Sequence, residues 1–202
     1  MFNSHPYGGY LAWRLYPWKK TFIDTRWLNY TLQSEYAWIT GAVESVSEKT
    51  ISAQKTPLWK RLLDHYKINF IILDTLDVYG TVPKLLLALA RDKDWVPIYC
   101  EPIAVIFIKN IPENNSIIEK FRRQKEDIYN TVISLASYTA IFQRENPKYL
   151  ITLGKTFYEM GRLHDALTAY QYAYKRFPKE QGLKEKIAQV ESEIEKEKNE
   201  GD

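Results

Sequence analysis

Cysteine and histidine are scarce in this sequence, and their scarcity excludes several kinds of site. The single cysteine, Cys100, can form no internal disulfide bond. The three histidines, His5, His65 and His164, are scattered, and no CxxC or paired His/Cys spacing occurs. Because a structural zinc ion needs ligands at such spacings, the sequence predicts no metal site.

Concentrated positive charge is lacking as well. The chain has 28 Lys and Arg against 25 Asp and Glu, a formal net charge of +3. The densest basic run, RRQK at 122–125, is followed at once by Glu126 and Asp127. Proteins that bind nucleic acids usually carry a basic stripe or patch. We therefore expect no nucleic-acid partner.

Long apolar runs and nucleotide-binding motifs are also missing. No run approaches the ~20 apolar residues of a membrane helix, and no signal-peptide pattern is present. No GxGxxG follows the first strand and no GxxxxGK[ST] occurs, so we predict no cofactor. The composition, 45% hydrophobic and 26% charged, is typical of a folded soluble domain. Because the sequence begins inside a candidate strand, Phe2-Asn3, we expect it to be a piece of a longer protein.

The first half of the sequence alternates between strand-like and helix-like segments. Strands are predicted at 2–3, 21–24, 69–73, 95–101 and 103–109, and helices at 6–15, 28–49, 58–66 and 82–91. Glu101-Pro102 leaves room only for a tight antiparallel hairpin between the last two strands. The alternation predicts a three-layer α/β sandwich over residues 1–112, with a mostly parallel sheet and an antiparallel edge hairpin.

Polar residues cluster where the first two predicted strands end. In parallel sheets, ligand sites lie beyond the carboxyl ends of the strands. The candidate pocket for a sugar, a phosphate or a peptide consists of Asn3, His5, Tyr7, Asp24 and Arg26. In the alternative interpretation, Asp24 and Arg26 pair with each other or cap helices and so hold the loops in place. Gly8-Gly9 indicates a close backbone approach, either to a neighbouring element or to a ligand.

Several segments of the first half match the pattern of one family. They are Phe2-Asn3, Tyr7-Gly8-Gly9-Tyr10-Leu11 with Trp13, Phe22-Ile23-Asp24-Thr25-Arg26, and Trp59 with Leu62-Leu63-Asp64. Over about residues 1–109 the chain resembles the soluble domain that follows the membrane helices in C-type glycosyltransferase-like membrane proteins. These proteins are relatives of the dolichyl-phosphate-mannose protein mannosyltransferases. Thr25 stands where that family usually has glycine.

The resemblance implies a location and a role. The parent would be a polytopic membrane protein, and this chain would be its domain on the extracytoplasmic face of the cell membrane. In that family the catalytic carboxylate and the lipid-phosphate site are associated with the membrane helices and their loops. The resemblance therefore implies that this chain holds no catalytic residues and acts as an accessory domain.

The second half reads as helical. Residues 111–115 break the pattern and place a domain boundary at 112/113, with Ser116 and Glu119 as a capping box for the next helix. Residues 147–180 resemble one tetratricopeptide repeat over its ~34-residue period. The matching positions are Leu150, Leu153, Gly154, Phe157, Gly161, Ala166, Tyr170, Ala173 and Pro178. Gly154 and Ala166 are small enough for the two helices to approach closely, and Tyr170 fills the space between turns. Residues 113–202 are thus predicted to form an all-α domain.

Repeats of this type bind peptides on a concave face lined by their first helix. By motif position that face is Lys148, Ile151, Lys155 and Tyr158, and the expected partner is a protein or peptide. Because one repeat forms almost no groove, packing within the protein or self-association is the alternative. Helices at 116–144 and from Leu183 onward must supply its neighbours.

Two functional hypotheses follow. The first is a non-catalytic domain that binds a protein, a glycan or a sibling subunit. The second gives the α/β domain its own small-molecule, glycan or enzymatic site at the strand ends.

Overall fold

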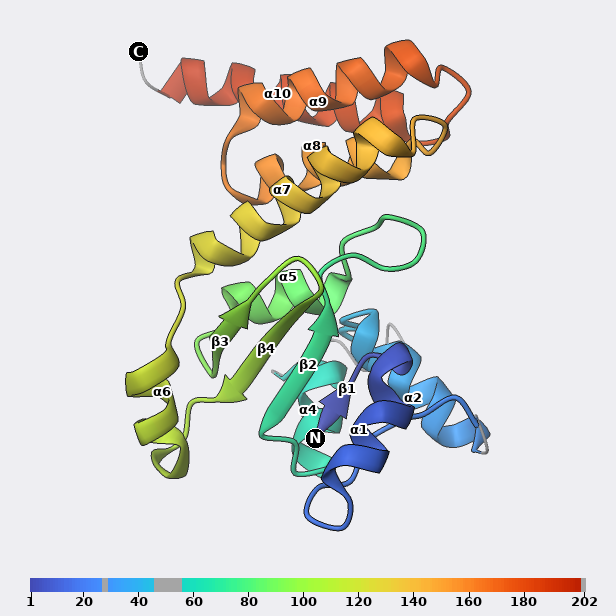
Figure 1. The fold of residues 1–202 in the computed structure, drawn as a ribbon. Coiled ribbons are helices and arrows are strands. Elements are labelled where there is room, and N and C mark those ends of the chain that lie inside the picture. Colours follow the sequence, from blue (N-terminus) through green and yellow to red (C-terminus); the bar gives the residue numbers. More distant parts are fainter. Residues whose placement is uncertain (27–28, 46–55, 201–202) are drawn as a thin grey trace. The chain divides into compact units, whose positions relative to one another are not determined.

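The structure is a computed structural model that describes residues 1–26, 29–45 and 56–200 (Figure 1). The chain divides into two compact units. The sheet unit comprises residues 1–75 and 83–125, and the helical unit comprises residues 76–82 and 126–202. The chain therefore passes between the units at 125/126, and a short segment within the first half belongs to the helical unit.

A four-stranded mixed sheet organises the sheet unit. Its strands are β1 (Phe2–Asn3), β2 (Phe70–Asp74), β3 (Trp95–Cys100) and β4 (Ala104–Lys109), in the order β1-β2-β4-β3. β1 and β2 are parallel, whereas β2 with β4 and β4 with β3 are antiparallel. The predicted edge hairpin is confirmed. The prediction of a mostly parallel sheet is wrong, because the hairpin joins the sheet through β4 and so adds a second antiparallel pair.

The centre of one face of this sheet, between β2 and β4, is fully buried. Ile71 pairs with Phe107 and Leu73 with Val105, and all four side chains are at most 1% exposed. The alternate positions Phe70, Ile72 and Ile106 are only partly buried. Ile108 and Val96, on the same face as Phe70, form a smaller buried cluster with Ile118 of the following helix, so parts of both faces are covered.

Short helices surround the sheet. They are η1 (His5–Tyr7), α1 (Gly8–Leu15), α2 (Tyr30–Thr40), α4 (Leu58–His65), α5 (Lys84–Arg91), η2 (Pro112–Asn114) and α6 (Asn115–Phe121). Figure 1 shows α4 and α5 behind the sheet. Both are amphipathic, with Leu62 and Leu63 buried on α4 and Leu85, Leu86 and Leu89 buried on α5. Of the helix predicted at 28–49, residues 28 and 46–49 lie outside the described residues.

Two local predictions are corrected. The strand predicted at 21–24 is irregular, because a side chain rather than a strand ladder holds it. Ser116 does not cap a helix as predicted, because it lies inside α6. The N-cap residue of α6 is Asn114. The helical material after the boundary forms two helices, α6 and α7 (Lys125–Phe142).

Three further helices complete the helical unit: α8 (Lys148–Glu159), α9 (Leu163–Arg176) and α10 (Leu183–Glu200). Gly161 turns the chain between α8 and α9 with a φ of 72°, in the left-handed region that favours glycine. The three helices share one core of buried residues, namely Leu150, Leu163, Ala166, Tyr170, Ala173, Leu183, Val190 and Ile194. The buried side chains of α10, Leu183, Val190 and Ile194, therefore face this shared core.

The segment 76–82 packs with α8. The Thr152 hydroxyl donates a hydrogen bond to the Gly80 carbonyl at 2.8 Å, and the Asn146 side-chain amide donates to the Tyr79 carbonyl at 3.0 Å. Gly80 has a φ of 86°, and a Cβ there would lie 2.5 Å from a ring carbon of Tyr149. The boundary predicted at 112/113 assigns this segment to the first domain. The segment instead belongs to the helical unit, because it contacts residues far away in the sequence.

Candidate functional sites

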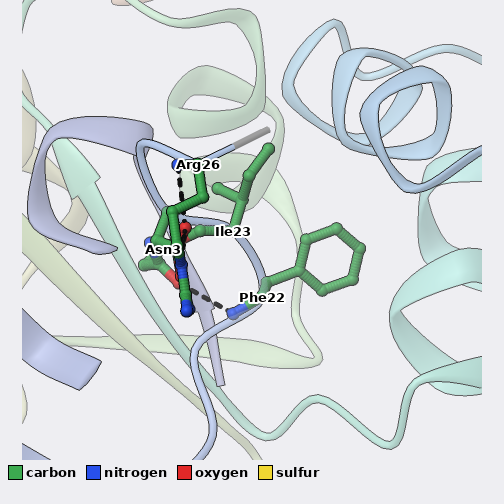
Figure 2. Close-up of polar contacts among 5 residues, drawn as sticks. Asn3, Phe22, Ile23 and Arg26 are labelled. Atoms are coloured by element: carbon green, nitrogen blue, oxygen red, sulfur yellow. Dashed lines mark hydrogen bonds and ion pairs between the residues drawn. The ribbon is translucent and has the colours of Figure 1, made fainter. Parts of the chain in front are cut away.

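Asn3 holds the N-terminal segment of the sheet unit together. Its side-chain amide donates to the carbonyls of Ser4 at 3.0 Å and Ile23 at 2.9 Å, while its side-chain oxygen accepts from the Phe22 amide at 2.9 Å. Figure 2 shows the bonds that join Asn3 to Phe22 and Ile23. The side chain is fully buried. Asn3 is thus occupied in fixing residues 22–23 beside β1.

Gly8 explains why this segment lies so close to α1. A Cβ on Gly8 would lie 2.1 Å from the Ile23 carbonyl oxygen and 2.6 Å from the Asp24 Cα, whereas nothing lies within 4 Å of one on Gly9. The close backbone approach predicted from the glycine pair is confirmed at Gly8, and the partner is a neighbouring segment.

Asp24 and Arg26 form an ion pair near the surface (Figure 2). The Arg26 backbone amide and Nε donate to Oδ1 of Asp24 at 2.9 and 3.0 Å, and Nη2 contacts Oδ2. These hydrogen bonds lower the pKa of Asp24 to about 2. The arginine side chain is 71% exposed, so solvent screens the pair. Asp24 and Arg26 therefore pair with each other, as the alternative interpretation predicts.

A small hollow of about 250 Å³ lies beside this ion pair. It is lined by Thr21, Phe22, Ile23, Asp24, Arg26, Asn29, Leu32 and Gln33. Asp24 and Arg26 line this hollow, whereas Asn3, His5 and Tyr7 do not. The hollow therefore offers a ligand one ion pair, whose two charges compensate each other, in a shallow recess with a partly apolar lining.

His5 and Tyr7 belong to a second polar cluster at the ends of β1 and β2. The His5 backbone amide donates to the Tyr36 hydroxyl at 3.0 Å, and the Tyr7 hydroxyl donates to the Ile103 carbonyl at 2.7 Å. Burial, with a smaller contribution from the Asp74 carboxylate, raises the pKa of Tyr7. Burial likewise raises the pKa of Tyr36. Both phenols stay protonated at neutral pH and act as hydrogen-bonding groups.

Sequence reasoning missed the contribution of Tyr36 to this cluster. Its ring stacks on Phe2 with the centroids 5.4 Å apart. In the sequence, Tyr36 lies in the middle of a helix with no motif around it. No local signal identifies it, because only the folded chain brings α2 to β1.

The four residues predicted to line a concave face largely contact other parts of the helical unit. Lys148 forms an ion pair with Glu180, in the segment between α9 and α10. The Tyr158 hydroxyl donates to the Glu193 carboxylate of α10 and accepts from the Gln189 amide at 2.8 Å. This hydrogen bond to Glu193 raises the pKa of Tyr158. Ile151 packs against the shared core, and Lys155 is half-buried.

A larger hollow, of about 670 Å³, lies elsewhere in the helical unit. It is lined by Ser137, Ala140, Ile141 and Arg144 of α7 and its end, Leu150 and Leu153 of α8, and Tyr172 and Arg176 of α9. We call this the α7–α9 groove. Ile141 and Tyr172 are 59% and 52% exposed, so the groove opens to solvent with apolar walls.

Two arginines supply the charge of the α7–α9 groove. Arg176 donates through Nη2 to the Arg144 carbonyl at 2.9 Å, and its guanidinium lies 6.0 Å from the ring centroid of Tyr172. None of the eight lining residues is acidic. The groove therefore suits an apolar ligand that carries a negative charge. The sequence analysis did not predict this groove. Apolar residues on both sides of α7 were a signal for it, because Val132 is buried in the core and Ile141 is exposed on the opposite side.

Two further features, a metal site and a membrane-spanning helix, are absent from residues 1–26, 29–45 and 56–200. Among these residues there is no group of three or more His, Cys, Asp or Glu side chains placed to hold a metal ion. Within the same ranges, none of the helices combines the length and the apolar character that crossing a bilayer requires.

Comparisons of the chain with protein-family models, with curated proteins and with solved structures give no match.

Proposed function

We propose that this chain is a non-catalytic binding module, and that its helical unit binds an acidic, partly apolar peptide segment of a protein partner. The observation that carries this proposal is the α7–α9 groove, with exposed apolar walls and two arginines. Apolar side chains anchored in such a groove supply affinity, while complementary charge favours the correct partner and speeds encounter.

The proposal includes the architecture and the parent protein predicted from the sequence. The helical unit is a tetratricopeptide-like repeat at 147–180 flanked by α7 and α10, and the sheet unit is a three-layer α/β sandwich. The close contact of Gly154 with Tyr170 and the buried Ala166 support the repeat. The parent is a glycosyltransferase-like membrane protein on whose extracytoplasmic face this accessory domain lies. The sequence resemblance alone supports this parent.

A peptide-display selection tests the binding function. A random peptide library is selected on the immobilised full chain, and the recovered peptides are synthesised and titrated by fluorescence anisotropy. We expect enrichment of acidic peptides with apolar anchors. Ile141→Glu places a charge on the wall of the groove and should weaken their binding at least about tenfold.

Tyr138→Glu is the matched control, because Tyr138 is 64% exposed on the same helix and does not line the groove. It should leave the dissociation constant unchanged. Equal binding of the peptides to wild type and Ile141→Glu would exclude the groove as the binding site. A dimer in sedimentation that Ile141→Glu abolishes would identify a second copy of the chain as the occupant instead.

The second candidate function is a small-molecule or glycan site in the sheet unit, and the hollow beside Asp24 and Arg26 favours it. The test is the unfolding temperature in the presence of neutral monosaccharides or inorganic phosphate. A ligand of the hollow should raise it in wild type but not in Arg26→Ala. No shift with any of these probes, or an equal shift in both proteins, would remove this candidate.

A further inference from the structure

An exposed aromatic segment follows the start of α1. Tyr10 and Trp13 are 62% and 77% exposed on the helix, and Tyr16 and Trp18 are 73% and 83% exposed just after it. Helix α1 buries only Gly8. Large aromatic side chains are usually at least half buried, so four of them exposed within nine residues form an unusual surface. Figure 1 shows α1 and the turn after it at the periphery of the sheet unit.

Two of these four aromatic side chains are in contact. The rings of Tyr10 and Trp13, three positions apart on the helix, are in tilted contact with their centroids 6.0 Å apart. Leu11 and Leu15 are half-buried on the other side of the helix. The segment therefore presents its aromatic rings outward and attaches to the rest of the unit through its aliphatic residues.

The same segment carries only positive side-chain charge. Arg14, Lys19 and Lys20 are exposed, and the first carboxylate in the sequence is Asp24. Within the described part of the chain, none of the three forms a salt bridge. The charges are therefore available to an external anion.

We propose that residues 10–20 form a surface that docks on an anionic lipid bilayer. Trp and Tyr prefer the water–hydrocarbon interface because each joins an apolar ring to a polar group. Lys and Arg beside them are attracted to acidic headgroups, and apolar and electrostatic contributions add. This inference rests on the exposed segment and not on the groove of the helical unit.

The charge of the segment distinguishes a bilayer from the other possible occupants. A second copy would bring Arg14, Lys19 and Lys20 against the same three cations, and like charges at an interface oppose association. A neutral carbohydrate would stack on the rings but would leave the three cations without an anionic partner. Residues 10–20 contain no Asp, Glu, Asn or Gln. An acidic lipid surface matches both the rings and the cations.

Vesicle flotation with the full chain tests this inference. The probes are phosphatidylcholine vesicles alone and with about 30% phosphatidylserine. We expect binding to the acidic vesicles that weakens as salt rises from about 50 to about 500 mM, because screening shortens the reach of the charges. Lys19→Glu with Lys20→Glu should lower the partition coefficient by about tenfold or more. Trp13→Ala with Trp18→Ala should lower it comparably.

Matched control variants distinguish loss of this surface from a general change in net charge or in exposed aromatic side chains. Lys196→Glu with Lys198→Glu changes the net charge equally on exposed positions of α10, and Tyr30→Ala removes an aromatic side chain that is 87% exposed on α2. Both controls should bind vesicles as wild type does, and circular dichroism should show all variants folded. No binding to acidic vesicles, or binding that the segment variants and the controls reduce equally, would overturn the proposal. So would self-association through Trp13 and Trp18 without vesicle binding.

Discussion

Gly154 of α8 lies against the ring of Tyr170 of α9, so closely that a Cβ on the glycine would be 2.5 Å from two ring carbons. The tyrosine is 4% exposed, and its ring cannot move aside into solvent. Burial raises the pKa of Tyr170, so its phenol stays protonated inside the helical core. The two residues set how closely α8 and α9 approach each other.

We predict that Gly154→Ala destabilises the helical unit. The added methyl group overlaps the Tyr170 ring, and overpacking costs about 1–3 kcal/mol. The higher helix propensity of alanine offsets ~1 kcal/mol of this loss. Urea denaturation followed by circular dichroism should show a lower midpoint. Gly9→Ala is the control, since nothing lies within 4 Å of its added Cβ, and it should be neutral or stabilising.

Asn3→Ala should destabilise the sheet unit by about 2–4 kcal/mol. It leaves the buried Phe22 amide and Ile23 carbonyl without their partner, and each such group costs about 1–3 kcal/mol. Asn115→Ala, at an exposed asparagine that begins α6, should change the free energy of unfolding by no more than about 0.5 kcal/mol. Equal midpoints for the two variants in guanidinium denaturation would contradict the role given to Asn3.

The pKa of Asp24 should depend on Arg26. Because the folded-state pKa, about 2, lies below the ordinary value of 3.8, the ion pair stabilises the protein above pH 4. This stabilisation is lost as the pH falls toward 2, and solvent screening keeps it small for so exposed an arginine. Carboxyl NMR titration should show Arg26→Ala raising the pKa of Asp24, whereas Arg14→Ala leaves it unchanged.

Tyr66 should titrate at strongly alkaline pH. Its hydroxyl donates to the Glu35 carboxylate of α2, and this hydrogen bond raises its pKa to about 12. The raised pKa means that the protonated phenol stabilises the fold below pH 10 and that this contribution disappears as the pH rises through 12. Glu35→Gln should lower the pKa, measured by NMR of labelled tyrosine rings with Tyr66→Phe for assignment. An unchanged titration in Glu35→Gln would show that burial alone causes the shift.

Local pattern determined much of the helical unit. Gly161 between two apolar-periodic segments predicts the turn, and the small residues Gly154 and Ala166 predict close packing. These features depend on residues a few turns apart in sequence, where periodicity is informative. The hairpin of β3 and β4 was predictable for the same reason, since Glu101-Pro102 leaves no room for a crossover. The position of the α7–α9 groove was not, because it depends on how α7 lies along α8 and α9.

The sequence by itself determined where most of the helices and strands lie, because their periodic patterns depend on neighbours along the chain. Only the tertiary structure decided that β4 rather than β3 pairs with β2, and that Asn3 holds residues 22–23 in place of a strand ladder. It also decided that Asp24 and Arg26 line the small hollow whereas His5 and Tyr7 do not. The physical reason is that strand partners and side-chain hydrogen bonds join residues far apart in sequence. Their choice depends on the packing of the whole unit, which no local pattern encodes.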